Sequence, residues 1–241
     1  MPLFTPDADA RAARSNHRFV LDARFVMSAF DELLRHPHLW RARESEPSSE
    51  VRGLPSGHPA LDRCLPGHGW PQQGLIEILT DRYGIGELSL LMPALAFLSR
   101  KDEHASPAHE SNDEGWLAWI SPPYQPYAPA LAACGIDVER VLIVRAGPAC
   151  WAMEQALRSG ACRAVLGWAT PNRPHDLRRL HLAAEQSRCL AVLFRRAGDA
   201  ESSSPAVLRI GLRPAGQHGL EVRVLKSRGG NPAQLTLPRV H

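Results

Sequence analysis

The chain has 241 residues, of which 44% are hydrophobic and 22% charged, and its formal net charge is +3 at pH 7. This composition is normal for a globular protein and excludes a disordered, collagen-like or cysteine-rich secreted chain. No apolar run is long enough to span a bilayer and the N-terminus has no export-signal pattern, so we expect a cytoplasmic protein without membrane contact. The five cysteines and eleven histidines show no metal-ligand spacing, which predicts reduced thiols and no bound metal.

Two parts are expected along the chain: a flexible N-terminal segment with one helix and a linker (residues 1–52), and a core domain (residues 53–241). The helix is predicted from apolar residues at helical spacing that stop before a proline, namely Val26, Phe30, Leu33, Leu34 and Pro37. This helix either packs on its own domain, which is the commoner case, or binds a partner protein.

In the core, apolar strands alternate with helices, which is typical of an α/β fold with a mostly parallel central sheet and helices on both faces. Five such strands are expected, at residues 75–79, 116–120, 141–144, 164–167 and 190–194. Helices are expected before and between them, at residues 59–65, 87–98, up to about 133, 149–159 and 175–186. Two further strands, at residues 206–212 and 220–225, are predicted to form an antiparallel hairpin at the C-terminal edge of the sheet.

The turn after the first strand has the outline of a phosphate-binding loop without its chemistry. In a working loop a lysine and a serine or threonine follow the last glycine, whereas Gly86 is followed by Glu87 and Leu88. Taking Gly84 as the last glycine supplies neither group. A carboxylate about 4 Å from a phosphate oxygen costs roughly 4 kcal/mol near a protein surface, so we expect this degenerate loop to bind no nucleotide cofactor. The alternative is an ordinary strand–turn–helix unit with incidental glycines.

The C-terminal part of the chain is basic. Residues 195–241 contain eight basic side chains and only three acidic ones: Arg195, Arg196, Arg209, Arg213, Arg223, Lys226, Arg228 and Arg239 against Asp199, Glu201 and Glu221. This excess permits contact with nucleic acid, and the alternative is a solvated sheet face.

Several motifs together resemble the ImuA family. They lie at residues 53–57 and 60–62, 84–91 and 93–95, 120–123 and 126–131, 154–162 and 178–185. ImuA proteins are degenerate relatives of the recombinase RecA that are encoded with an error-prone translesion polymerase. The resemblance implies a RecA-like core of the P-loop type, and it places the cell-division inhibitor SulA as a more distant, shorter relative.

The resemblance also implies that the protein is not an enzyme. The phosphate-binding lysine and the magnesium-binding hydroxyl of the RecA ATPase correspond to Glu87 and Leu88. The water-activating glutamate has no counterpart after Ile120, and the strand at residues 164–170 offers no magnesium-associated aspartate. Phosphoryl transfer depends on these groups, so ATP hydrolysis is not expected.

Candidate contact residues for a partner or DNA follow from the same comparison. Lys226 and Arg228 look like a lysine pair that in RecA reaches the nucleotide of the neighbouring protomer, and Arg223 lies on the predicted strand before them. The two DNA-binding loops of RecA would correspond to residues 170–176, with Arg173, and to residues 195–204. Arg195 and Arg196 in the second loop could touch phosphates as salt-sensitive contacts.

The function that this resemblance implies is that of a non-catalytic adaptor in the SOS-induced complex for translesion DNA synthesis, a DNA-damage response that causes mutagenesis. Its expected partners are an ImuB-like inactive Y-family polymerase homologue, RecA, and indirectly an error-prone polymerase of the replicative type, with weak DNA contact. The alternative is a SulA-type inhibitor that binds the tubulin-like division GTPase. The greater length of this chain argues against this alternative. A third alternative is a true ATPase with an unusual loop.

Overall fold

The computed structural model describes residues 52–100, 115–145, 147–171, 173–216 and 219–238, all of which belong to one compact unit of the chain. The expected N-terminal segment, apart from Arg52, and its predicted helix lie outside the described residues. The division of the chain at residue 52 therefore stays a prediction.

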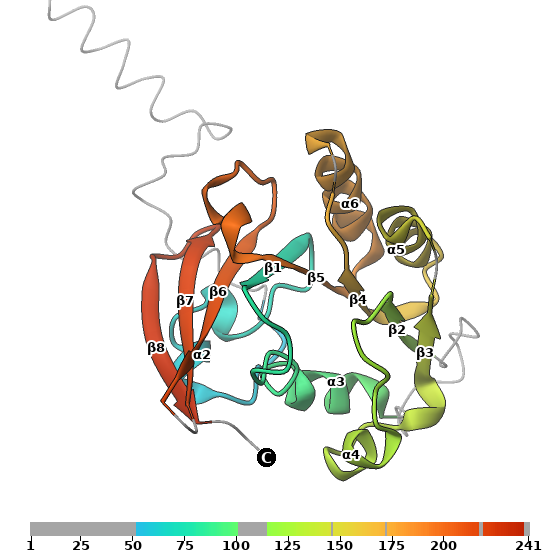
Figure 1. Cartoon of the computed structure of the whole chain (residues 1–241), viewed down its shortest axis with the longest axis horizontal. Helices are drawn as coiled ribbons and strands as arrows, with labels where there is room; N and C mark the ends of the chain where they lie inside the picture. Colours follow the sequence, from blue (N-terminus) through green and yellow to red (C-terminus); the bar gives the residue numbers. More distant parts are fainter. Residues whose placement is uncertain (1–51, 101–114, 146, 172, 217–218, 239–241) are drawn as a thin grey trace, which may run out of the picture. The chain divides into compact units, whose positions relative to one another are not determined.

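The centre of the fold is one mixed sheet of eight strands in the order β3-β2-β4-β5-β1-β6-β7-β8 (Figure 1). The strands are β1 Leu75–Thr80, β2 Trp116–Ile120, β3 Val141–Val144, β4 Cys162–Trp168, β5 Leu190–Arg196, β6 Leu208–Ala215, β7 Gly219–Ser227 and β8 Ala233–Pro238. The first six in this order run parallel, whereas β7 is antiparallel to both β6 and β8. All six residues of β1 are buried, because β5 and β6 flank this strand and both of its faces are covered.

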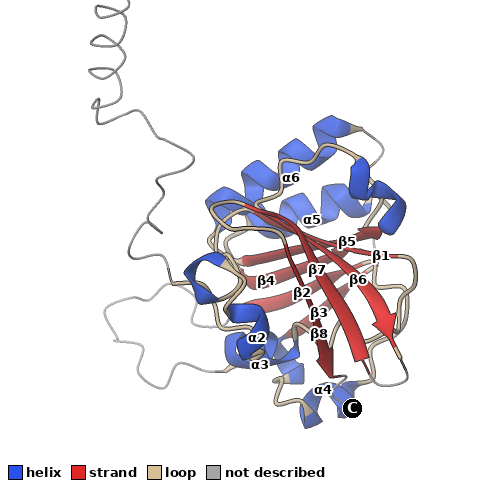
Figure 2. Ribbon diagram, turned by 90° about the vertical axis from the view of Figure 1, so that its left-hand side faces the viewer, coloured by secondary structure: helices blue, strands red, loops and turns tan. Residues whose placement is uncertain are grey.

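Helices cover both faces of the sheet. They are α2 Pro59–Asp62, α3 Met92–Ser99, α4 Ala128–Ala133, α5 Ala149–Arg158 and α6 Pro174–Ser187. Figures 1 and 2 show α5 and α6 on one face and α2, α3 and α4 on the other. Two separate apolar clusters result, since neighbouring residues of a strand point to opposite faces. Thus Ile76 of β1 packs on the side of α3, and Leu75 packs on the side of α5 and α6.

The helix after β1 begins later than the sequence predicts. Residues 87–91 form a turn, and α3 begins at Met92 with Pro93 in its first turn. Proline lacks an N–H and has its φ already fixed near the helical value, so it suits the first helical position better than the interior. Glu87 therefore lies in a turn before the helix and not in the first helical turn.

The C-terminal edge of the sheet also differs from the prediction. A further strand, β8, pairs with β7 and forms the edge that the sequence assigns to β7. The sequence pattern of β8 predicts a strand only weakly, because only Leu237 of its six residues is buried. None of the described helices is both long and apolar enough to cross a membrane.

Candidate functional site

The turn after β1 is closed by its own glutamate. The main-chain N–H of Gly84 lies 2.9 Å and 3.0 Å from the two carboxylate oxygens of Glu87, and the N–H of Ile85 donates to Oε2 at 3.0 Å. Gly84 and Gly86 have φ values of +82° and +100°, which glycine adopts without strain. Glu87 is buried, and Leu88 packs against the apolar cluster on the α3 side. Two of the main-chain N–H groups of this turn therefore already have an anionic acceptor.

Exposed aromatic side chains occur in the connections that follow the C-terminal ends of β2 and β3. Tyr124 and Tyr127, in the connection from β2 to α4, are 65% and 71% exposed, and Trp151 in the first turn of α5 is 55% exposed. The two connections are joined, because Arg145 Nη2 donates to Gln125 Oε1 at 2.9 Å. We call Tyr124, Tyr127, Arg145 and Trp151 the aromatic edge. Aromatic and arginine side chains are enriched where proteins bind each other, so this surface has the composition of an interface.

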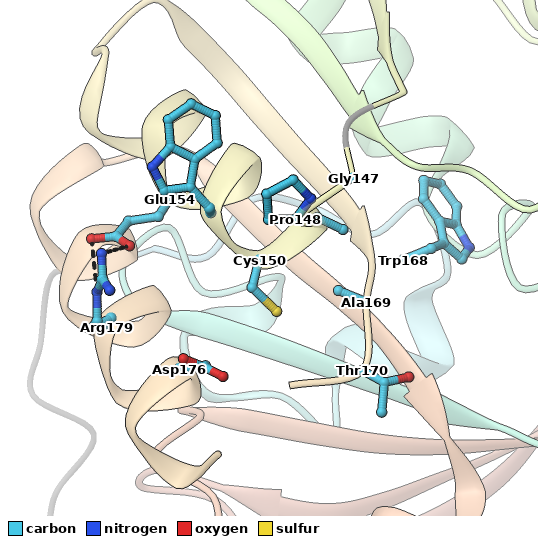
Figure 3. Close-up of a pocket in the computed structure, with 11 residues that line it drawn as sticks. Gly147, Pro148, Cys150, Glu154, Trp168, Ala169, Thr170, Asp176 and Arg179 are labelled. Carbon is cyan, nitrogen blue, oxygen red and sulfur yellow. Dashed lines mark hydrogen bonds and ion pairs between the residues drawn. The ribbon is translucent and has the colours of Figure 1, made fainter. Parts of the chain in front are cut away.

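A cavity of about 400 Å³ opens beside the aromatic edge. Figure 3 shows it between the first turns of α5 and α6 and the end of β4. Glu154 and Arg179 line the cavity, and buried Glu154 forms ion pairs with Arg179 and with Arg158. Burial raises the pKa of the Cys150 thiol, the charge of Asp176 raises it further, and the charge of Arg195 opposes them. Since the thiolate is the reactive form, Cys150 is not an activated nucleophile.

No group of three or more histidine, cysteine, aspartate or glutamate side chains within the described part of the chain could hold a metal ion.

Arg195, one of the predicted contact residues, is buried and does not form the predicted contact. Its side chain is 5% exposed, and Nη1 donates to Glu77 Oε1 at 3.0 Å while Nη2 lies 3.3 Å from Asp199 Oδ2. A guanidinium enclosed in this way cannot reach a phosphate group of a partner. Its neighbour Arg196 is exposed at the beginning of the short 3₁₀ helix Ala197–Glu201, and Arg173 is exposed before α6. These two arginines stay predicted contacts.

The remaining predicted residues lie on or next to β7. Arg223, Lys226 and Arg228 are exposed on or just after β7. Lys226 Nζ donates to the carbonyl oxygen of Ser204 at 2.8 Å, and Arg228 Nη1 lies 3.6 Å from Glu185 Oε1. The predicted positions therefore belong to three different parts of the fold. One group is the turn at Glu87, one lies after β4 and at the end of β5, and one lies on and just after β7.

The aromatic edge is absent from the residues predicted from the sequence. A signal was present, since Tyr124 and Tyr127 stand in a proline-rich stretch where apolar burial is hard to achieve. Buried Glu77 was also overlooked, although an acid inside the apolar strand β1 is a pattern that requires a buried partner.

The protein is thus an α/β protein with a surface suited to binding another protein after the C-terminal ends of its parallel strands. SulA of Edwardsiella piscicida, a cell division inhibitor, is 36% identical to this chain over 149 residues, which cover 57% of this chain and 81% of that protein. The crystal structure of SulA from Pseudomonas aeruginosa matches with 27% identity and a TM-score of 0.38, over 50% of this chain and 97% of that one. No family model matches the chain. Because the first match covers most of a relative at 36% identity, the chain belongs to the SulA family of cell division inhibitors.

This result corrects the assignment to the ImuA family and the role in translesion synthesis, DNA repair and mutagenesis that it implied. The partners inferred from it, namely the ImuB-like homologue, RecA, the error-prone polymerase and weakly bound DNA, are wrong for the same reason. Short stretches rich in glycine, proline and leucine carried the resemblance, and they do not separate related families. Chain length was misleading as well, since the SulA match covers only 57% of this chain and the extra length lies outside it.

The predicted RecA-like core of the P-loop type is corrected too. The structure shows an eight-stranded mixed sheet, and the match is to SulA. In place of a phosphate-binding loop, the turn after β1 holds the carboxylate of Glu87.

Proposed function

We propose that this protein is a cell-division inhibitor that acts by binding the tubulin-like division GTPase in the cytoplasm, without catalytic activity of its own. The observation that carries the proposal is the match to a cell division inhibitor over 81% of that protein's length. Inhibition by binding needs one complementary surface and no reaction centre.

The aromatic edge is the surface that we assign to this contact. Tyrosine and tryptophan side chains supply large rigid contact areas at low entropic cost, and a few such residues carry most of the affinity of an interface. Tyr124 and Tyr127 are the most exposed large apolar side chains among the described residues. Arg145 adds a cation beside them, held in place by Gln125.

The absence of catalysis is part of the proposal. The Glu87 carboxylate accepts hydrogen bonds from the N–H groups of Gly84 and Ile85 in the turn after β1, so a nucleotide phosphate at these groups would have to displace a buried anion. The cavity beside the aromatic edge offers Cys150 with a raised pKa and a Glu154 that is already paired with two arginines. These features favour a binding role over chemistry.

The test uses the full chain and the purified division GTPase of the same species. We expect the chain to form a complex with the GTPase, to suppress its polymerisation in a light-scattering assay near equimolar ratio, and to cause filamentous growth when overproduced. Replacing Tyr124 and Tyr127 together by alanine should weaken binding by about tenfold or more, the usual effect of losing two central aromatic contacts.

Phe97→Ala is the matched control, because Phe97 is also an exposed aromatic residue, at 60%, but lies in the last turn of α3. That end of α3 lies near the beginning of β4, where Arg163 donates to the carbonyl oxygen of Leu98. Phe97 is therefore near the N-terminal ends of the parallel strands, whereas the aromatic edge follows their C-terminal ends. A folded chain that does not bind the GTPase at micromolar concentration would refute the function. Equal losses in the tyrosine variant and the Phe97 variant would refute the surface alone.

A further inference from the structure

The sheet has a second exposed surface, on the strands β6 and β7. Leu212 of β6 and Val222 of β7 point into the apolar cluster, so alternate residues point to the opposite face. Arg213 and Arg223 are exposed on that face. Exposed Lys226 lies there too, because the register shifts between Arg209 and Ile210 and Lys226 pairs with Arg209. We call these three residues, together with Arg228 just beyond β7, the basic face.

Two acids lie beside this charge, Glu221 of β7 and Glu185 of α6, whose Oε1 is 3.6 Å from Arg228 Nη1. Glu221 lies beside Arg213 in the strand register, and its carboxylate accepts a hydrogen bond from Gln234 Nε2 at 3.1 Å. Arg223 pairs in register with Gly211 on one side and Gln234 on the other, neither of which carries a charge. Within the described part of β6, β7 and β8, Glu221 is the only acidic residue.

The positive charges on this face lie close enough together to repel one another. Burial lowers the pKa of Lys226, and the positive charges of Arg209 and Arg228 lower it further, while Glu77 opposes them. Arg209 itself is fully engaged, because its Nε donates to Glu77 and its other nitrogens donate to main-chain carbonyl oxygens of the β5–β6 connection. Arg209 is therefore not free to bind a partner, whereas an anion added at the exposed cations would reduce the repulsion between them.

We propose that the basic face binds an acidic, extended segment of a partner protein, through carboxylates that pair with Arg213 and Arg223. Guanidinium groups bind carboxylates in a planar, bidentate geometry, and pairs with this geometry are stronger than simple point-charge contacts. Nucleic acid fits less well, because single strands are held by bases stacked on aromatic side chains. Each exposed large apolar residue in the described part of the chain lies outside β6, β7 and β8. This contact is independent of the aromatic edge and does not rest on the proposed function.

The test measures binding of a fluorescein-labelled peptide of about ten glutamates to the full chain by fluorescence anisotropy. Because exposed charges act over roughly 10 Å at 0.1 M salt, we expect binding at about 50 mM salt that weakens about tenfold at about 300 mM. Arg213→Glu combined with Arg223→Glu should abolish it, and Arg223→Gln alone should weaken it by a few fold. Arg178→Glu is the matched control, because Arg178 is exposed on α6, away from β6 and β7.

Three results would overturn the proposal. One is that the unaltered chain does not bind the peptide at low salt. Another is that the Arg178 variant loses as much affinity as the variants of the basic face, which would mean that net charge alone attracts the peptide. The last is that a single-stranded or duplex oligonucleotide binds the same face more tightly than the peptide. Thermal unfolding of each variant verifies that it is folded.

Discussion

Glu77 Oε2 lies 2.7 Å from Arg209 Nε inside the sheet, and Oε1 of the same carboxylate lies 3.0 Å from Arg195 Nη1. Ser204 Oγ donates to the carboxylate as well, at 2.9 Å. One buried carboxylate on β1 thus joins β5, β6 and the connection between them. Because the apolar interior destabilises unpaired charges, this acid and its two arginines depend on each other.

Replacing Glu77 by alanine should therefore be strongly destabilising. It leaves Arg195 and Arg209 buried without their shared anion, and breaking a buried pair in this way costs about 3–5 kcal/mol of unfolding free energy. Urea denaturation followed by tryptophan fluorescence measures the loss. The matched control, Glu139→Gln at an exposed position, should change stability by less than about 0.5 kcal/mol. Equal stability of the two variants would show that the cluster contributes nothing.

Stability should depend on the acceptor oxygens of the residue at position 87 more than on the size of its side chain. Glu87→Ala leaves the N–H groups of Gly84 and Ile85 without an acceptor and should cost about 1–3 kcal/mol. Glu87→Gln keeps one oxygen and should cost about half as much or less. Chemical denaturation compares the two. A glutamine variant as unstable as the alanine variant would contradict the assignment of the hydrogen bonds.

His181 should make stability depend on pH. Its pKa is lowered chiefly by burial, with Arg228 and Lys226 acting in the same direction and Glu185 opposing. Its Nδ1 accepts a hydrogen bond from the Leu75 N–H, which requires that this nitrogen carry no proton. The unfolded chain therefore binds this proton at higher pH than the folded chain does.

The contribution of His181 is complete above its unfolded pKa of about 6.5, is lost as the pH falls below that value, and levels off beneath the lower folded pKa. Between about pH 7.5 and pH 5.5 the unaltered protein should lose more stability than His181→Gln, which cannot be protonated. Denaturation curves at the two pH values decide the point. Parallel losses in both proteins would show that other groups cause the effect.

The cysteines should differ widely in reactivity. Burial raises the pKa of Cys189 to about 11, and the residue is buried, whereas Cys134 at the end of α4 is exposed. At about pH 8 an alkylating reagent should modify Cys134 first and Cys189 about a hundredfold more slowly, because the thiolate is the reactive form. Mass spectrometry of quenched samples follows the order, and Cys134→Ser should remove the fast step. Early labelling of Cys189 in the folded protein would contradict its burial.

The sequence predicts the strands of the sheet well. Trp116–Ile120 and Val141–Val144 agree with the prediction to the residue, and the other predicted strands overlap those observed. Short apolar runs between glycine and proline turns allow few conformations other than a buried strand. β8 was missed because its exposed and half-buried residues lack that signal.

The site could not be predicted in the same way. The pairing of Glu77 with Arg209 joins residues 132 positions apart, so it depends on strand order, which local patterns do not encode. The same holds for the contact between Gln125 and Arg145 that brings the aromatic edge together. Motif resemblance identified a group of related families but chose the wrong member, since the stretches it used are shared within the group.

The position of β1 has a consequence for how the protein is made. This strand is the first of the sheet to leave the ribosome, yet its neighbours β5 and β6 begin only at Leu190 and Leu208. More than a hundred residues must be synthesised before either edge of an apolar six-residue strand is paired, and long-range pairing of this kind is slow. During that interval the nascent chain exposes a segment prone to self-association. We therefore expect the chain to stay soluble in the cell only if translation continues through β6, or if a chaperone shields Leu75–Thr80 until then.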